Sequence, residues 1–282
     1  MIPPGGEVQK GQRPFWPPGG EVQEGRRPSW PPEALLGYLL LAVLLAAWEA
    51  AARLGALPTD LLPPASAVLG ELWRLALSGE LWRQGGATLG RSLAGFAVGG
   101  LLGSGLGFCC GAFPGFGRAC RVTVEFLRPM PSVALVPIGI LFLGLGFGLC
   151  VAVAGFACAW PAYVAALAGA GAAGPQLRDT ARVYGLSAGE TLFFVRLPAA
   201  APQVLSGLRV ALAVAVAVTV TTEMAASPNG LGSFILESSL ARRPEAMYAG
   251  IAAVGLLGWG LGAGFTVLRD RALGWMPRGG RR

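Results

Sequence analysis

Apolar stretches of about 20 residues recur along this chain, and short polar segments that carry most of the arginines separate them. A bilayer core about 30 Å thick needs about 20 apolar residues for one helical crossing. With 54% hydrophobic and only 13% charged residues among 282, the chain is too apolar for a water-soluble domain. The sequence therefore predicts an all-α polytopic membrane protein with about six transmembrane helices.

The expected crossings cover residues 35–55, 89–113, 122–146, 147–170, 203–222 and 248–268. Residues 68–82 predict a short interfacial helix with Trp73 and Trp82 as anchors. A short loop is expected around Arg118 and Arg121, and a longer, turn-rich loop at residues 225–247. Arg209 lies near one end of the fifth crossing and is expected to extend to the membrane surface.

Residues 1–32 differ in composition from the rest of the chain. A unit rich in proline, glycine and charge occurs there twice in tandem. Such a segment cannot bury a core, so we expect it to be disordered. The sequence thus predicts a repeat tail at residues 1–32, a membrane domain at residues 33–277 and a basic tail at residues 278–282.

The residue types argue against a metal, cofactor or nucleic-acid site. The chain has no histidine, and its five cysteines lack C-x-x-C spacing, so we predict no metal, cofactor or disulfide framework. The net charge of +7 comes from arginines beside apolar segments, which is typical of membrane topology signals. We therefore expect the bilayer, and not nucleic acid, as the surrounding partner.

One apolar segment carries a glycine at every fourth position. A helix with this spacing has one face almost without side chains, which allows another helix to approach closely. A dinucleotide-binding role is excluded because no strand surrounds the glycines. We expect tight packing inside the bundle at Gly95, Gly99, Gly103, Gly107 and Gly111.

Charges and prolines inside the third and fifth apolar segments mark candidates for a transport pathway. Pro129 and Pro131 should break the helix, which is tolerated in a bilayer only where protein or a water-filled cavity satisfies the freed backbone groups. Glu125 and Arg128 are three residues apart and could pair, either facing a cavity or as a structural ion pair. Glu223 could line the mouth of the pathway or cap its span.

A polar hinge separates the fourth and fifth crossings. Gly185 predicts the end of a helix that starts at Pro175, because glycine accepts the left-handed conformation there. Ser187 and Glu190 have the spacing of a capping box, which predicts a new helix directly afterwards. This second helix is expected to be short, and Pro198 with Pro202 is expected to end it and start the next crossing.

The hinge resembles the EAA loop of the permease subunits of binding-protein-dependent ABC transporters, which reads E-A-A-x3-G-x9-I-x-L-P. The matching positions here are Asp179, Thr180, Ala181, Gly185, Val195, Leu197 and Pro198. The resemblance implies that this segment, with the capping residues Ser187 and Glu190, is a cytoplasmic coupling helix that docks on an ATPase.

A second segment, from Arg128-Pro129-Met130-Pro131 to Gly148, resembles the nitrate, sulfonate and taurine branch of the same family. The resemblance implies an importer of a small solute, in which residues 33–277 are the permease domain. It also implies a cytoplasmic ATP-binding subunit, an extracytoplasmic substrate-binding protein and a second permease subunit. We expect a homodimer, while a heterodimer remains open.

Arginine and lysine counts predict the orientation. With six crossings, fourteen of these residues fall on the side of the termini and the hinge, and six fall on the other side. The termini and the hinge should therefore be cytoplasmic, in a multi-pass protein of the inner membrane. The only lysine, Lys10, is not in a phosphate-binding loop, so ATP hydrolysis must come from a separate subunit and the chain is not an enzyme.

Two other classes of protein fit the sequence less well. An ion-coupled secondary transporter needs no ATPase, but it would be favoured by inverted repeats, and the repeat in this sequence lies in the tail. A membrane-embedded enzyme is disfavoured because the chain lacks histidine and a G-x-S-x-G nucleophile motif.

Overall fold

The computed structural model describes residues 33–55 and 61–275. Within these ranges the secondary structure is helical, without strands. The repeat tail predicted at residues 1–32 and the basic tail at 278–282 lie outside the described residues. By its contacts the chain divides into two units, Met1–Ala47 and Trp48–Arg282.

Of the first three helices in the described part of the chain, the first and the third are long and apolar enough to cross a membrane. Helix α1 covers Glu33–Arg53, α2 covers Ala65–Leu77 and α3 covers Glu80–Ala112. The interfacial helix predicted at residues 68–82 ends earlier than expected. Gly79 takes a left-handed φ of 81° between α2 and α3, so Trp82 belongs to α3.

The third apolar segment is broken at its prolines, as predicted. Helix α4 covers Pro114–Leu127, followed by the 3-10 helix η1 (Ser132–Leu135) and helix α5 (Val136–Leu143). The two halves meet at an angle of 84°. The loop predicted around Arg118 and Arg121 is wrong, because Pro114 starts α4 directly after α3 and both arginines are helical.

Helix α6 (Phe147–Ala170) matches its predicted range, and α7 (Pro175–Val183) leads into the hinge. Beyond the hinge, α8 (Ala188–Glu190), the π-helical stretch η2 (Thr191–Arg196) and α9 (Leu197–Ala226) form one continuous run. The separate short helix predicted there is therefore wrong. The wider π turn accommodates the missing N–H of Pro198, so the helix continues through it.

The C-terminal part adds two helices. Helix α10 (Leu231–Leu240) occupies much of the segment predicted as a loop, and α11 covers Pro244–Ala272. A helix of ten residues is too short to cross a membrane, and its apolar face packs on its neighbours with Leu231 and Ile235 buried.

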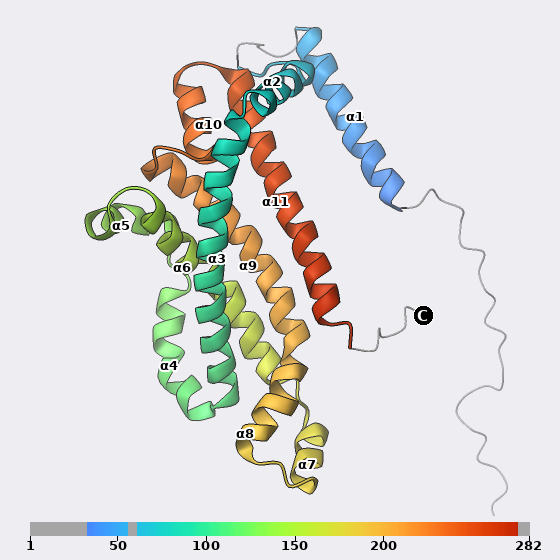
Figure 1. Cartoon of the computed structure of the whole chain (residues 1–282), viewed down its shortest axis with the longest axis vertical. Coiled ribbons are helices and arrows are strands. Elements are labelled where there is room, and N and C mark those ends of the chain that lie inside the picture. Colours follow the sequence, from blue (N-terminus) through green and yellow to red (C-terminus); the bar gives the residue numbers. More distant parts are fainter. Residues whose placement is uncertain (1–32, 56–60, 276–282) are drawn as a thin grey trace, which may run out of the picture. The chain divides into compact units, whose positions relative to one another are not determined.

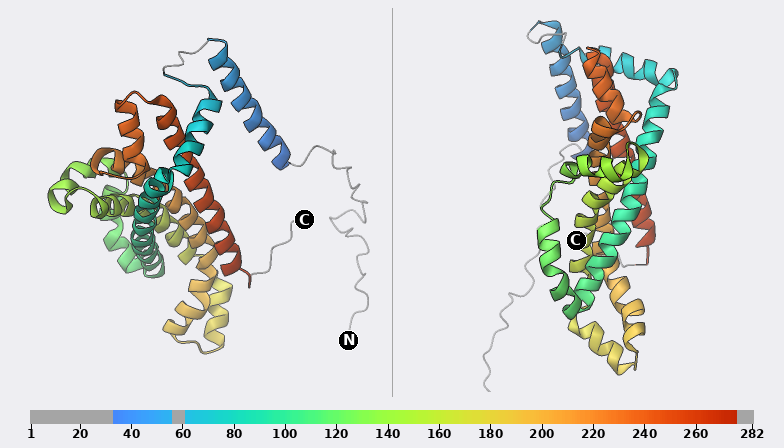
Figure 2. Two further views of the ribbon diagram at one scale, coloured as in Figure 1. Left: turned by 45° about the horizontal axis from the view of Figure 1, so that its top comes forward. Right: turned by 90° about the vertical axis from the view of Figure 1, so that its left-hand side faces the viewer.

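Helix α6 is the centre of the bundle and lies between α3 and α9 (Figures 1 and 2). The predicted role of the glycine row is confirmed. A Cβ atom at Gly99, Gly103 or Gly107 would collide with backbone atoms of α6. The α6 backbone fills the space that these glycines leave, and this close approach determines which helix α3 packs against.

Among the residues that the structure describes, five helices are long and apolar enough to cross a membrane, or six if the bent pair α4 and η1–α5 counts as one crossing. The prediction of an all-α polytopic protein with about six spans is confirmed. In Figure 1, α7 and α8 lie at one end of the α3–α6–α9 bundle and α2 and α10 at the other.

Candidate functional site

The hinge between α6 and α9 is a compact turn built by backbone hydrogen bonds. The Leu186 amide donates to the Ala181 carbonyl over 3.0 Å, and the Gly185 amide donates to the Arg182 carbonyl over 3.0 Å. Together they form a Schellman motif, which requires a left-handed residue at Gly185. Its φ of 70° confirms the prediction that the helix ends at this glycine.

The predicted capping box is also present. The Ser187 amide donates to Glu190 Oε2 over 2.8 Å, and the Glu190 amide donates to Ser187 Oγ over 3.3 Å. These bonds satisfy backbone groups at the start of α8 that have no helical partner. The chain thus reverses direction between Tyr184 and Ala188, and both helix ends are satisfied locally.

The hinge exposes large apolar side chains. Val183 and Tyr184 at the end of α7 are 86% and 80% exposed, and Phe193 and Phe194 on η2 are 65% and 73% exposed. Apolar groups gathered on such a small segment are typical of a protein or membrane contact. We call these four residues the hinge patch.

The remaining residues of the predicted EAA-like motif take different positions. Asp179 and Thr180 are exposed on α7, whereas Ala181 is 2% exposed and packs inward. Asp179 accepts a hydrogen bond of 3.3 Å from Arg182. Val195 is the second-last residue of η2, and Leu197 and Pro198 begin α9.

One further residue joins the hinge to the bundle. Arg196 Nη1 donates to the carbonyl of Ala112, at the last residue of α3, over 3.2 Å. The hinge is therefore continuous with α9 through the helix and tied to α3 through this arginine. In the sequence, Arg196 contributes only to the excess of arginine and lysine on the side of the hinge, because nothing near it points to Ala112.

A groove of about 800 Å³ lies along α6 and α9, next to the break after α4. Its polar lining comes from Arg128 and Ser132 at the break and from Gln203 and Ser206 on α9. Apolar residues of both helices complete it: Ala157, Trp160, Val164, Val210, Val214 and Val218. We call it the α6–α9 groove.

The five predicted pathway residues do not all line one groove. Arg128 and Pro131 line the α6–α9 groove, and Pro129 lies beside them in the chain. Glu125 lies on α4 and pairs with Arg121, whose Nε is 2.8 Å from Oε1, instead of with Arg128. Glu223 is fully buried inside the bundle.

Glu223 is the centre of a buried polar network. Its Oε1 accepts a hydrogen bond of 2.7 Å from Arg91 Nη1, and its Oε2 accepts bonds from the Thr88 hydroxyl (2.8 Å) and the Gly232 amide (3.1 Å). Both side chains of the ion pair are buried, at 7% exposure for Arg91 and 0% for Glu223. Because the carboxylate is paired and fully hydrogen-bonded, it can remain in a membrane span.

The same network fixes the turn before α10. Arg91 Nη1 donates to the Asn229 carbonyl over 2.8 Å, the Gly230 amide donates to Gln84 Oε1 over 2.6 Å, and the Leu231 amide donates to Thr88 Oγ1 over 2.8 Å. Gly230 has a φ of 115°, and a Cβ there would collide with the Glu223 carboxylate. This network therefore joins α3, α9 and α10 at the end of the bundle away from the hinge.

The sequence reasoning missed the α3 side of this network. Gln84, Thr88 and Arg91 follow one another at intervals of four and three residues, so they share one helix face. A polar stripe of this spacing next to an apolar span was a usable signal for a buried partner. It did not show that the partner was Glu223.

Residues 99–272, more than half of the chain, match the family described as "Binding-protein-dependent transport system inner membrane component". The taurine transport system permease protein TauC of Escherichia coli is 29% identical over 240 residues, covering 83% of this chain and 87% of TauC. A Bacillus subtilis protein assigned to aliphatic sulfonates transport, SsuC, is 28% identical over 243 residues, covering 85% of this chain and 87% of SsuC.

The fold is similar to that of a chain in the crystal structure of the MetNI methionine ABC transporter in an inward facing conformation. The TM-score is 0.60 at 17% sequence identity, and the match covers 73% of this chain and 98% of the other. At this identity the similarity concerns the fold alone.

Proposed function

The chain belongs to the family of binding-protein-dependent transport system inner membrane components. We propose that a cytoplasmic ATPase binds to its hinge and moves it. The chain is a non-catalytic, multi-pass inner-membrane permease subunit of an ABC transporter. The proposals below assign roles to the hinge, to the α6–α9 groove and to the partner proteins.

The hinge patch is the observation that carries the coupling proposal. Val183, Tyr184, Phe193 and Phe194 expose apolar surface at one end of the bundle. The Schellman turn and the capping box hold both sides of this surface in one shape. Docking of an ATPase on it would move α8, η2 and α9 together, because these segments form one continuous helix.

The residues assigned to coupling are those of the predicted motif: Asp179, Thr180, Ala181, Gly185, Ser187, Glu190, Val195, Leu197 and Pro198. Exposed members of this set would contact the ATPase. Ala181, which is buried, would instead set the packing of α7.

We place the solute path along the α6–α9 groove. The groove combines an exposed arginine, Arg128, with the polar side chains of Ser132, Gln203 and Ser206 on otherwise apolar walls. Arg128, Pro129 and Pro131 would shape its entrance, because the helix breaks there. Glu125 and Glu223 would stabilise the protein around the path instead of lining it. Glu125 pairs with Arg121 on α4, and Glu223 holds α3 to the turn before α10.

The cargo is proposed to be a small sulfonate or a related anion. The similarity to proteins named for taurine and aliphatic sulfonates transport supports this class, and the arginine in the groove is compatible with an anion. The proposed assembly contains a substrate-binding protein and a second permease subunit, taken as an identical copy. The termini and the hinge are proposed to face the cytoplasm.

Replacement of Phe193 and Phe194 together by Asp tests the coupling proposal. Both side chains are exposed, so the fold of the chain does not depend on them. Loss of two apolar anchors from an interface should weaken ATPase binding at least about tenfold. The measurement is the amount of ATPase that copurifies with the chain from mild detergent, together with ATP-dependent solute uptake.

Gly189→Ala provides the matched control, since a Cβ at this exposed position of α8 meets nothing within 4 Å. It should retain the ATPase. Copurification and uptake at the unmodified level in the double Asp variant would contradict the docking proposal, because the ATPase would then bind without these two side chains.

A further inference from the structure

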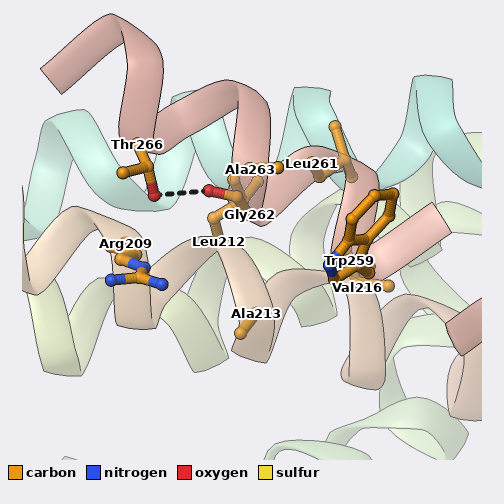
Figure 3. Close-up of a pocket in the computed structure, with 10 residues that line it drawn as sticks. Arg209, Leu212, Ala213, Val216, Trp259, Leu261, Gly262, Ala263 and Thr266 are labelled. Carbon is orange, nitrogen blue, oxygen red and sulfur yellow. Dashed lines mark hydrogen bonds between the residues drawn. The ribbon is translucent and has the colours of Figure 1, made fainter. Parts of the chain in front are cut away.

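A second groove, of about 560 Å³, runs between α9 and α11 (Figure 3). Arg209 and Thr266 line one end of it, and Val216 and Trp259 line the other. Between them the walls are apolar or bare backbone, formed by Leu212, Ala213, Gly258, Leu261, Gly262 and Ala263. A charged residue, Arg209, therefore lies at one end of an apolar groove between two membrane-spanning helices. We call the apolar part of this groove the trough.

Within the described part of the chain, Arg209 has no partner for its charge. Among the described residues it makes no hydrogen bond or ion pair, and the Thr266 hydroxyl beside it donates to the Gly262 carbonyl over 2.8 Å. A guanidinium in a membrane span is costly unless an anion or water neutralises it. The contacts within the chain therefore leave its five N–H donors available to an anion from outside the protein.

The groove is separate from the α6–α9 groove. The latter uses Gln203, Ser206 and Val210 of α9, whereas the second groove uses Arg209 and Val216. At about 100° per residue, these two sets lie on different sides of α9. An occupant of the second groove would not stand in the proposed solute path.

The depth of Arg209 matches a lipid headgroup. Thr266, which lies beside it, precedes the basic last turn of α11, where Arg269 and Arg271 are located. Val216 is seven residues further along α9 than Arg209, which is roughly 10 Å at about 1.5 Å per residue. The trough thus leads from the level of the basic helix end toward the interior of the span.

We propose that this groove binds an anionic phospholipid, with its phosphate on Arg209 and an acyl chain along the trough toward Trp259. A phospholipid supplies both an anion and an apolar tail at this separation. A small soluble anion would satisfy only Arg209 and would leave the apolar walls unfilled. Basic pockets between transmembrane helices are sites of this chemistry.

Glycines make room for the acyl chain. A Cβ at Gly258 or Gly262 meets nothing within 4 Å, so both positions open onto the trough. A larger side chain at either position would therefore start into the open groove. Gly264, also on α11, is open too but does not line the groove.

The test is a lipid titration of the delipidated full-length chain in mild detergent, followed by native mass spectrometry. Phosphatidylglycerol and phosphatidylcholine with identical acyl chains are the probes. We expect the unmodified chain to prefer phosphatidylglycerol about fivefold, the contribution of one arginine near anionic lipid. Arg209→Gln should abolish this preference, whereas Gly262→Leu should weaken binding of both lipids.

Arg118→Gln and Gly264→Leu are the matched controls, since each makes the same change outside the groove, and both should keep the preference. Thermal unfolding of every variant checks that the fold is intact. Equal binding of the two lipids by the unmodified chain would overturn the proposal, as would a preference that persists in Arg209→Gln.

Two further measurements separate the lipid from other occupants. Glycerol 3-phosphate carries the headgroup anion without an acyl chain, and it should not displace phosphatidylglycerol. Displacement of phosphatidylglycerol by glycerol 3-phosphate at equal concentration would mean that the trough contributes nothing to lipid binding, and it would overturn the proposal. A cysteine at Ala213 that cross-links to a second copy, or to another segment of the chain, would show a protein contact in the groove and would also overturn the proposal.

Discussion

Glu223 is completely buried, yet its carboxylate receives hydrogen bonds from an arginine, a threonine hydroxyl and a backbone amide. Each acceptor oxygen has a donor, and the charge is compensated at 2.7 Å by Arg91. Burial of the pair costs free energy of desolvation, but removal of one partner costs more, because it leaves an uncompensated charge inside the bundle. The pair also selects one position of the Asn229–Gly232 turn against α3.

Glu223→Leu should therefore lower the free energy of unfolding by about 3–5 kcal/mol, because it leaves Arg91 buried without its anion. Combining it with Arg91→Met should recover part of this loss. The exposed pair of Arg121 and Glu125 is the control, and Glu125→Leu should cost less than about 1 kcal/mol. Thermal unfolding in mild detergent measures the stability of the unmodified chain, the two single variants and the double variant. An equal loss for Glu223→Leu and Glu125→Leu would contradict the structural role of the buried pair.

At the scale of helices, the contact between α3 and α6 depends on the absence of side chains. A Cβ at any of five α3 glycines would meet backbone or side-chain atoms of α6: Gly95, Gly99, Gly103, Gly107 and Gly111. Without a hydrophobic driving force between helices in lipid, close van der Waals packing supplies much of the association energy. The glycine row thus determines both the partner of α3 and the distance between the two helices.

Gly103→Val should destabilise the bundle by at least about 1–3 kcal/mol, since its side chain would overlap the backbone of Ala159 and force the helices apart. Gly105→Val is the matched control on the same helix. Gly105 is exposed and its Cβ would meet nothing within 4 Å, so the change should be close to neutral. The yield of monodisperse protein and its thermal unfolding are the measurements, and similar losses for both variants would contradict the packing argument.

At the scale of the whole molecule, the two ends of α9 carry different structures. The hinge precedes α9, and the buried network with α10 follows it. Because α9 crosses the membrane between them, the hinge and the α10–α11 connection must lie on opposite sides. The excess of arginine and lysine places the hinge on the cytoplasmic side in our proposal.

Labelling with a membrane-impermeant thiol reagent tests this orientation. Gly189→Cys on α8 should react only after the cells are opened, whereas Arg242→Cys between α10 and α11 should react in intact cells. The chain has cysteines of its own, so each variant is compared with the unmodified protein. The reverse pattern would invert the topology and would remove the hinge from any cytoplasmic ATPase.

Local signals in the sequence predicted much of this architecture. Apolar length predicted the spans, Gly185 and the Ser187–Glu190 box predicted the hinge turn, and the prolines near Arg128 predicted the broken span. The hinge and break signals depend on residues within one or two helical turns, and each span depends on one continuous apolar stretch, so none of them requires the rest of the fold. Helix α10 and the passage of α9 through Pro198 were missed, because packing on neighbouring helices and a π turn overrode the local signals.

The sequence by itself determined that the chain crosses a membrane several times, where its helices break, and which helix face is bare. The tertiary structure alone decided that the bare face of α3 meets α6, that Arg91 pairs with Glu223 across 132 residues of sequence, and that Arg196 reaches Ala112. These choices depend on the register of helices packed side by side. The register depends on the whole bundle. Many helix faces could pack against the same glycine row or pair with the same buried charge, and only the packing of all the helices together selects one arrangement.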